Sequence, residues 1–279
     1  MPEGDTLHRT ALTLQRAIGG QVVLGFSTAY ATLAAVDDQA PVSGRTIEQV
    51  TAVGKHLLMH LSASDPPAAH GAGHARALVL RTHMRMSGAW HLYRPGEPWR
   101  VRASAVRIRI DTAPWTALAV NVPVAEFVAA SALGRHAPLA RLGPDVLGET
   151  FDTTAGATRL TSAGSTPIAE ALLDQRLVSG IGNVLRSEVL FLAGIDPHVA
   201  AGDLDSARLD ALLVTARKVM RLSTRLGERR TTSRANREED LWVYGRAGRP
   251  CRRCGTPIAV SRRGADARPL FWCPTCQPA

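Results

Sequence analysis

The sequence predicts an α+β protein in which one helix leads a β-rich region and a helical region follows. Residues 5–18 carry apolar side chains at helical spacing. Residues 21–122 form short apolar runs broken by glycine, proline and aspartate, and residues 106–110 alternate strictly, as strands do. After about residue 130 the spacing is helical again, and four cysteines near the chain end indicate a small metal-binding module.

The first predicted helix begins at Asp5 and ends at the glycine pair 19–20. Asp5 suits the N-cap position, and apolar residues follow at helical spacing from Leu7 to Ile18. Glu3 therefore directly precedes a helix N-terminus, where a carboxylate is electrostatically favoured.

The helical region is predicted to contain three helices. The first has Pro167 in its first turn and ends around residues 177–180. The second opens at Asn183 and runs to Gly194. The third carries apolar residues at helical spacing across 209–219.

A glycine-rich turn, Gly180-Ile181-Gly182-Asn183, joins the first two of these helices. Glycines let backbone N–H groups approach a phosphate closely, and the following helix N-terminus adds its dipole. Such a turn is weak support for nucleic-acid binding by itself. The basic charge and the cysteine module strengthen this interpretation.

The composition favours a polyanionic partner and argues against a membrane protein. The formal net charge is +9 and the isoelectric point is about 10.4, although ribosome-like or simply basic proteins share such values. No apolar run is long enough to span a membrane and no leader opens the chain, so we expect a soluble, cytoplasmic protein. Lys55 and Lys218 are the only lysines among 33 basic residues. Since arginine cannot replace lysine in proton transfer, Lys55 is a candidate functional residue, whereas Lys218 lies in an amphipathic stretch and is expected at the surface.

The four cysteines follow the pattern Cys251-x₂-Cys254-x₁₈-Cys273-x₂-Cys276. Two thiolate pairs at this separation predict a zinc site with a β-hairpin between the pairs. Four sulfur ligands close the coordination sphere, so the metal is expected to be structural. A zinc ribbon that only stabilises the chain end, or that binds protein, is the alternative. Arginines at 262, 263 and 268 lie between the pairs and suit phosphate contacts or plain solvent exposure equally well.

Pro2 can become a nucleophile. An initiator Met before proline is normally removed in the cytosol, which leaves a secondary α-amine at the new terminus. Such amines have a pKa of roughly 7.7–8.0, so a useful fraction is neutral at physiological pH. A secondary amine that attacks a sugar carbon gives an iminium, the Schiff base of covalent catalysis. Met-Pro is also a common start without meaning, and these two residues alone do not decide between the interpretations.

The chain resembles the Fpg/Nei family of bifunctional DNA glycosylases and AP lyases along nearly its whole length. The shared motifs, in chain order, are Pro2-Glu3-Gly4, Gly54-Lys55, Thr82-His83-Met84-Arg85-Met86-Ser87-Gly88, Leu142-Gly143-Pro144-Asp145, Asp174-Gln175, Gly180-Ile181-Gly182-Asn183, and Arg268 with the cysteine-containing segment 271–277. Several of these motifs are individually specific, and their order makes coincidence very unlikely.

The resemblance implies three domains and a DNA substrate. It implies a helix-led catalytic β-sandwich at residues 1–130, a helical domain with a helix–two-turn–helix motif at 131–240, and a four-cysteine zinc finger at 241–279. It also implies damaged double-stranded DNA as the partner, with single-stranded or bubble DNA left open. We expect a monomer that works on the nucleoid in the cytoplasm.

The resemblance also implies roles for individual residues. Pro2 is the nucleophile that attacks the sugar C1′ once Met1 is gone. Glu3 is the general acid at the sugar ring oxygen and later a proton shuttle, and Lys55 donates a proton or stabilises charge at the same sugar. Met86 fills the void left by the flipped nucleotide, and the flanking phosphates are held by Asn183 and Arg268.

Three departures bear on the substrate. Position 4 is Gly rather than Leu, as in the endonuclease VIII branch, and residues 119–129 contain no arginine, unlike the 8-oxoguanine (Fpg) branch. Oxidised pyrimidines are therefore the preferred substrates in our interpretation. Thr6 stands where many members have a second glutamate. The alternatives are an 8-oxoguanine-type glycosylase and a catalytically weak protein that binds damaged DNA.

Overall fold

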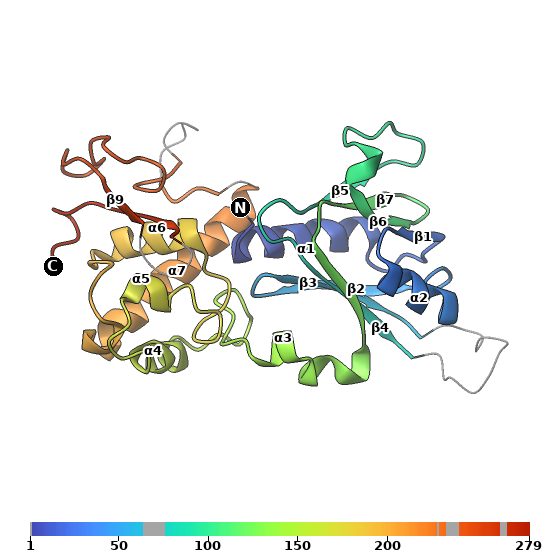
Figure 1. The fold of residues 1–279 in the computed structure, drawn as a ribbon, viewed down its shortest axis with the longest axis horizontal. Coiled ribbons are helices and arrows are strands. Elements are labelled where there is room, and N and C mark those ends of the chain that lie inside the picture. The colour runs from blue at the N-terminus through green and yellow to red at the C-terminus, as the bar shows by residue number, and fades with distance from the viewer. Residues whose placement is uncertain (1, 64–75, 228, 233–239, 263–266) are drawn as a thin grey trace. The chain divides into compact units, whose positions relative to one another are not determined.

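The protein divides into two compact units in a computed structural model (Figure 1) that describes residues 2–63, 76–227, 229–232, 240–262 and 267–279. The first unit comprises residues 7–140 with Pro2, and the second comprises residues 141–279 with residues 3–6. Met1 and Arg263 lie outside the described residues. The division into three domains stays a prediction.

The first unit contains two four-stranded antiparallel sheets, ordered β1-β6-β7-β5 and β2-β3-β4-β8. The strands are β1 (Gly25–Thr28), β2 (Ile47–Val53), β3 (His56–Leu61), β4 (Leu78–His83), β5 (Ala89–Tyr93), β6 (Val106–Asp111), β7 (Thr116–Val120) and β8 (Val124–Ala129). The helices are α1 (Gly4–Ile18), α2 (Ala31–Gln39) and α3 (Ala137–Ala140), with 3₁₀ turns at Ala103–Ala105 and Ala130–Arg135.

Both sheets and helix α1 share one hydrophobic core. Leu14 of α1, Met59 of β3, Leu80 of β4 and Ile108 of β6 belong to the same buried cluster, and each is at most 1 % exposed. Two sheets that cover a common core form a sandwich. The predicted helix-led β-sandwich is therefore confirmed, as is the strand at 106–110.

The second unit is helical, with one short hairpin. Its helices are α4 (Thr153–Thr161), α5 (Ile168–Ala171), α6 (Asn183–Ala193) and α7 (Ser206–Leu226), with a 3₁₀ turn at Ala201–Asp203. The hairpin pairs β9 (Ala259–Arg262) with β10 (Pro269–Trp272) in antiparallel register. Helix α6 lies at the centre of this unit, and its residues from Asn183 to Phe191 are all buried.

Helix α5 is shorter than the sequence predicted. It ends at Ala171, and the next backbone hydrogen bonds are those of turns, which reach back three residues. Asp174 Oδ1 accepts from Arg176 N at 2.9 Å, and Gln175 Oε1 accepts from Gly180 N at 3.0 Å. Side chains that bond nearby backbone in this way compete with helix formation. Helices α6 and α7 occupy the positions that the sequence predicted.

In the part of the chain that the structure describes, no helix combines the length and apolar character that crossing a membrane requires.

Candidate functional site

Helix α6 begins at a buried carboxylate that comes from the other end of the chain. Glu3 is fully buried, and its Oε1 accepts from Val184 N at 2.8 Å. Its Oε2 accepts from Gly182 N and from Leu185 N, both at 3.1 Å. The first N–H groups of a helix have no partner within the helix, and the helix dipole favours a negative charge there. Glu3 therefore caps α6.

This geometry corrects the role expected of the glycine turn. The sequence suggested that the glycines of this turn let backbone N–H groups approach a phosphate. The Gly180 N–H instead donates to Gln175 Oε1, and the Gly182 N–H donates to Glu3. Gly182 is required for this contact, since a Cβ there would lie 2.3 Å from Glu3 Cδ. The anion at this helix end is the protein's own Glu3 carboxylate.

Gly4 holds the same chain end against the turn. Its N–H donates to the Gly180 carbonyl at 2.8 Å. A Cβ at Gly4 would lie 2.7 Å from Gly180 Cα, closer than side chains come to backbone. The glycine that distinguishes position 4 in the sequence thus permits two backbones to touch.

Arg229 is a site residue that the sequence did not single out. Its guanidinium donates to both carboxylate oxygens of Asp5, at 2.8 and 2.5 Å, and to Thr6 Oγ1 at 3.1 Å. It also lies 3.8 Å from Glu3 Oε1. Asp5 is therefore a buried ion-pair partner inside the first turn of α1, which begins at Gly4, and the N-cap role predicted for it is wrong.

Asn183 and Arg268 meet where α6 contacts the hairpin. Asn183 is 2 % exposed, and its Nδ2 donates to the Pro269 carbonyl at 3.0 Å and lies 3.4 Å from the Tyr244 hydroxyl. Arg186, one turn further along α6, donates to the Arg268 carbonyl at 3.3 Å. The structure therefore brings Glu3, Asn183 and the Arg268 backbone together around the first turns of α6.

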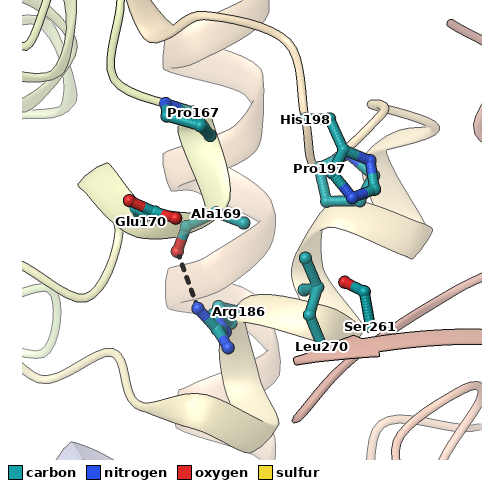
Figure 2. Close-up of a pocket in the computed structure, with 8 residues that line it drawn as sticks. All are labelled: Pro167, Ala169, Glu170, Arg186, Pro197, His198, Ser261 and Leu270. Carbon is teal, nitrogen blue, oxygen red and sulfur yellow. Dashed lines mark hydrogen bonds between the residues drawn. The ribbon is translucent and has the colours of Figure 1, made fainter. Parts of the chain in front are cut away.

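A small cavity of 130 Å³ lies beside Arg186, between α5, α6 and β10 (Figure 2). Arg186 donates to the Ala169 carbonyl at 3.4 Å. Burial, and then the charge of Arg268, lower the pKa of Arg186 to about 10, so it is still protonated at neutral pH. Its contacts are to backbone carbonyls, and they connect α5 to the Arg268 segment.

Lys55 lies in the first unit, at the tip of the β2–β3 hairpin. Val53 pairs with His56, which leaves Gly54 and Lys55 as the two-residue turn, and Gly54 has the positive φ of 57° that such turns need. Burial lowers the pKa of His83 to about 4, and the positive charge of Lys55 contributes to that shift. Lys55 and His83 are therefore electrostatic neighbours.

A network of charged and histidine side chains lies next to this turn. Arg81 contacts His56 Nδ1 at 2.8 Å and forms an ion pair with Glu126. Glu126 also lies 3.0 Å from His136 Nε2. Burial, then the charges of His83 and Arg81, lower the pKa of His56 to about 3, so this ring is neutral at physiological pH. The members of this network lie far apart in the chain, so local sequence patterns do not reveal it.

Met86 projects from the β4–β5 loop with 67 % of its surface exposed. The loop is closed by a hydrogen bond from Gly88 N to the Met84 carbonyl at 2.9 Å. A Cβ at Gly88 would lie 2.7 Å from that oxygen, so the tight loop requires glycine there. A large apolar side chain so exposed is unusual unless it meets a partner.

The four cysteines gather in the second unit as the sequence predicted. Their sulfur atoms lie within 4.8 Å of one another, with Sγ–Sγ distances of 3.9 Å for Cys251–Cys276 and 3.5 Å for Cys254–Cys273. Tetrahedral zinc with bonds of about 2.3 Å requires sulfur atoms roughly 3.8 Å apart. A hydrogen bond with Thr256 lowers the pKa of Cys254 to about 6, whereas burial raises the pKa of Cys273 and of Cys276, so the distances between the sulfur atoms are the evidence for a site. The cluster therefore fits a tetrahedral metal.

Comparison with known proteins places these features in one family. The chain matches the formamidopyrimidine-DNA glycosylase N-terminal domain over residues 1–122 and the formamidopyrimidine-DNA glycosylase H2TH domain over residues 142–235. It is 37 % identical to a probable endonuclease 8 2 of Streptomyces coelicolor, over 99 % of this chain and 94 % of that protein. The chain belongs to the Fpg/Nei family of DNA glycosylases and AP lyases.

Further relatives agree with this assignment. The chain is 34 % identical to the DNA-(apurinic or apyrimidinic site) lyase Nei2 of Mycolicibacterium smegmatis, over 100 % of both chains. The crystal structure of Lactococcus lactis formamidopyrimidine-DNA glycosylase, non-covalently bound to DNA with an AP site, matches with a TM-score of 0.81 at 22 % identity over 100 % of both chains. That likeness shows the shared fold. The predicted class of enzyme, a bifunctional glycosylase and AP lyase of DNA repair, is confirmed at the level of the family.

The residues that the sequence predicts to be functional lie in both compact units. Pro2, Lys55 and Met86 belong to the first unit, whereas Glu3 and Asn183 belong to the second, together with Arg268 and the cysteines. Arg229 and the His56–Arg81 network are the additions from the structure. A buried acidic pair at Glu3 and Asp5 was the signal that could have pointed to a cation such as Arg229, because buried charges are normally compensated.

Proposed function

We propose that this chain removes oxidised bases, pyrimidines above all, from double-stranded DNA and cleaves the strand at the abasic site. The observation that carries the proposal is the fixed Glu3. Its carboxylate is buried and bound by three N–H groups of α6, and it is the direct chain neighbour of Pro2. Several relatives are named endonuclease 8, which agrees with the branch that the sequence resembles.

The chemistry begins at Pro2 after removal of Met1. The Pro2 amine forms a bond to the sugar C1′ while the bond from C1′ to the damaged base breaks, and the base leaves with a proton. Opening of the sugar ring gives an iminium between Pro2 and C1′. The iminium draws electrons from C2′, so loss of a C2′ proton expels the 3′ phosphate by β-elimination.

Two side chains would move the protons of this sequence. Glu3 protonates the sugar ring oxygen and later carries a proton away, and its three backbone donors fix the direction of its carboxylate. Lys55 donates a proton or stabilises charge at the same sugar. Lysine suits this task because its amine can lose a proton, whereas arginine stays charged.

Three residues would grip the DNA. Arg268 and Asn183 hold the phosphates that flank the flipped nucleotide. The 3.4 Å contact from Asn183 Nδ2 to the Tyr244 hydroxyl is long. We assign the Nδ2–H of this contact to a DNA phosphate in the complex. Met86, exposed on its loop, inserts into the stack and offsets part of the few kcal/mol that base extrusion costs.

The four cysteines would hold a structural zinc ion. Thiolates in a Cys₄ set leave no open position, so zinc would fix the hairpin and the Arg268 segment without entering the reaction. Removal of zinc by a chelator should therefore lower the affinity for DNA, measured by fluorescence anisotropy. An unchanged affinity would show that the hairpin does not depend on the metal.

Borohydride trapping tests the proposal directly. Wild-type protein without Met1 is incubated with duplexes that contain an abasic site, thymine glycol, dihydrouracil or 8-oxoguanine, and with single-stranded and bubble versions. We expect a covalent adduct with the abasic site and the pyrimidine lesions, and its loss in Pro2→Gly. Stronger trapping on 8-oxoguanine would favour the Fpg-type alternative. Binding of abasic DNA without any adduct would favour a protein that only binds damage.

A further inference from the structure

One face of helix α7 carries four positive charges, and Asp145 is the acidic neighbour that acts on one of them, Arg217. Arg217, Lys218, Arg221 and Arg225 line one groove, and their spacing places them on the same side of the helix. Among the residues that the structure describes, none of the four forms an ion pair. Arg217 instead donates to the carbonyls of Phe151 and Gly148, and the nearby charge of Arg221 adds to burial in lowering its pKa.

The same groove has an apolar floor. Val214 and Leu222 line it and are 50 % and 40 % exposed, and Phe151 and Thr153 also line it. The volume is about 710 Å³, within the range of roughly 300–1,000 Å³ that is typical of ligand pockets. Exposed apolar side chains inside a concave, charged rim mark interaction surfaces.

Charge and shape together select the occupant. A DNA backbone would use the four cations and leave the apolar floor wet, since phosphate and sugar contacts are polar. An acidic amphipathic segment would use both, with its carboxylates on the rim and one or two large apolar side chains on the floor. Helix α7 contains one acidic residue, Asp210, which does not line the groove.

We propose that the α7 groove, lined by Phe151, Thr153, Val214, Arg217, Lys218, Arg221, Leu222 and Arg225, is a docking site for an acidic amphipathic segment of a partner protein. Such a contact would bring the enzyme to a protein already at the DNA. None of these residues belongs to the site built around Glu3, so docking and base removal are separable.

Fluorescence anisotropy with a short labelled peptide tests the proposal. The probe alternates Asp and Glu with Leu and Phe, and its control has Asn and Gln in place of the acids. We expect the acidic peptide to bind the full chain, and Lys218→Glu with Arg221→Glu to weaken it about tenfold or more, since tenfold corresponds to about 1.4 kcal/mol. Arg208→Glu, on the same helix outside the groove, should change the affinity about twofold or less, because a distant charge is screened.

A second pair of variants tests the floor. Leu222→Ser should weaken the peptide, whereas Leu226→Ser, equally exposed on the same helix but outside the groove, should not. Borohydride trapping should stay at the wild-type level in all these variants. Equal binding of the acidic and neutral peptides, or no binding, would overturn the proposal. A loss of duplex affinity in the Lys218→Glu, Arg221→Glu variant without peptide binding would instead assign the groove to DNA.

Discussion

Two buried carboxylates, Glu3 and Glu188, each accept hydrogen bonds from three backbone N–H groups at helix α6. They connect the helix to different segments of the chain. Glu3 reaches its first turn from the chain terminus and accepts from three backbone N–H groups. Glu188, on the helix itself, accepts from the N–H groups of Trp242, Val243 and Tyr244 at 2.8–2.9 Å and from the Thr231 hydroxyl. Both side chains are fully buried.

The two carboxylates differ in their charge environment. Glu3 lies 3.8 Å from Arg229, whereas Glu188 forms no ion pair within the described residues. Burial raises the pKa of Glu188, and the four hydrogen bonds that its carboxylate accepts oppose that shift. Glu188 ties the segment 240–244 to the helix, while Glu3 is the neighbour of the proposed nucleophile. Burial and hydrogen bonding thus do not by themselves distinguish a structural carboxylate from one that is proposed to react. The two carboxylates differ in the segment that each one fixes.

The largest effect on stability is expected from Glu188→Ala. The change leaves three N–H groups without an acceptor, while the Thr231 hydroxyl keeps the Asp240 carbonyl at 3.2 Å. Since each buried unsatisfied group costs about 1–3 kcal/mol, we expect a loss of about 4 kcal/mol in the free energy of unfolding, with some relief from water. Urea denaturation measures it. A loss below about 1 kcal/mol would mean that the segment 240–244 does not depend on this carboxylate.

Arg229→Gln should have the next largest effect. It leaves Asp5 buried without its cation and removes the charge near Glu3. Removing one partner of a buried ion pair costs about 3–5 kcal/mol. Because the arginine is partly exposed, we expect a loss of about 3 kcal/mol in the free energy of unfolding. Arg230→Gln is the matched control. Arg230 forms an ion pair with Asp240 at 3.1 Å, and a loss of about 1 kcal/mol is expected there. Equal losses would show that Arg229 has no special relation to the terminus.

The sequence predicted the features whose determinants are close in the chain. The start of α6 at Asn183, its end at Gly194 and the cysteine pairs all follow from local spacing. It predicted that Glu3 precedes a helix, and Glu3 does precede α1. It did not predict that Glu3 caps α6, because the two lie 179 residues apart. Arg229 was missed for the same reason, since its partner Asp5 lies 224 residues away.

Glu3→Gln separates stability from chemistry. The amide keeps one oxygen acceptor and turns an NH₂ group toward backbone N–H donors, so a loss of about 1–2 kcal/mol is expected. Borohydride trapping on abasic DNA should fall far more than this loss explains, because the folded fraction stays high. Glu188→Gln is the control. Its borohydride trapping should fall only as far as its lower stability reduces the folded fraction. If both variants lose trapping in proportion to stability, Glu3 is a structural carboxylate like Glu188.

Lys55→Arg should have the smallest effect on stability. It tests whether Lys55, rather than Glu3 alone, moves protons in the proposed reaction. Lys55 lies in a two-residue turn, where a substitution that keeps the charge should change the free energy of unfolding by about 0.5 kcal/mol or less. Arginine retains the positive charge toward His83 and the DNA but cannot release a proton at physiological pH. Single-turnover trapping should therefore slow, while the affinity for uncleavable abasic-analogue DNA stays near that of the wild type. A rate that stays at the wild-type level would assign Lys55 to charge stabilisation and leave the protons of the reaction to Glu3.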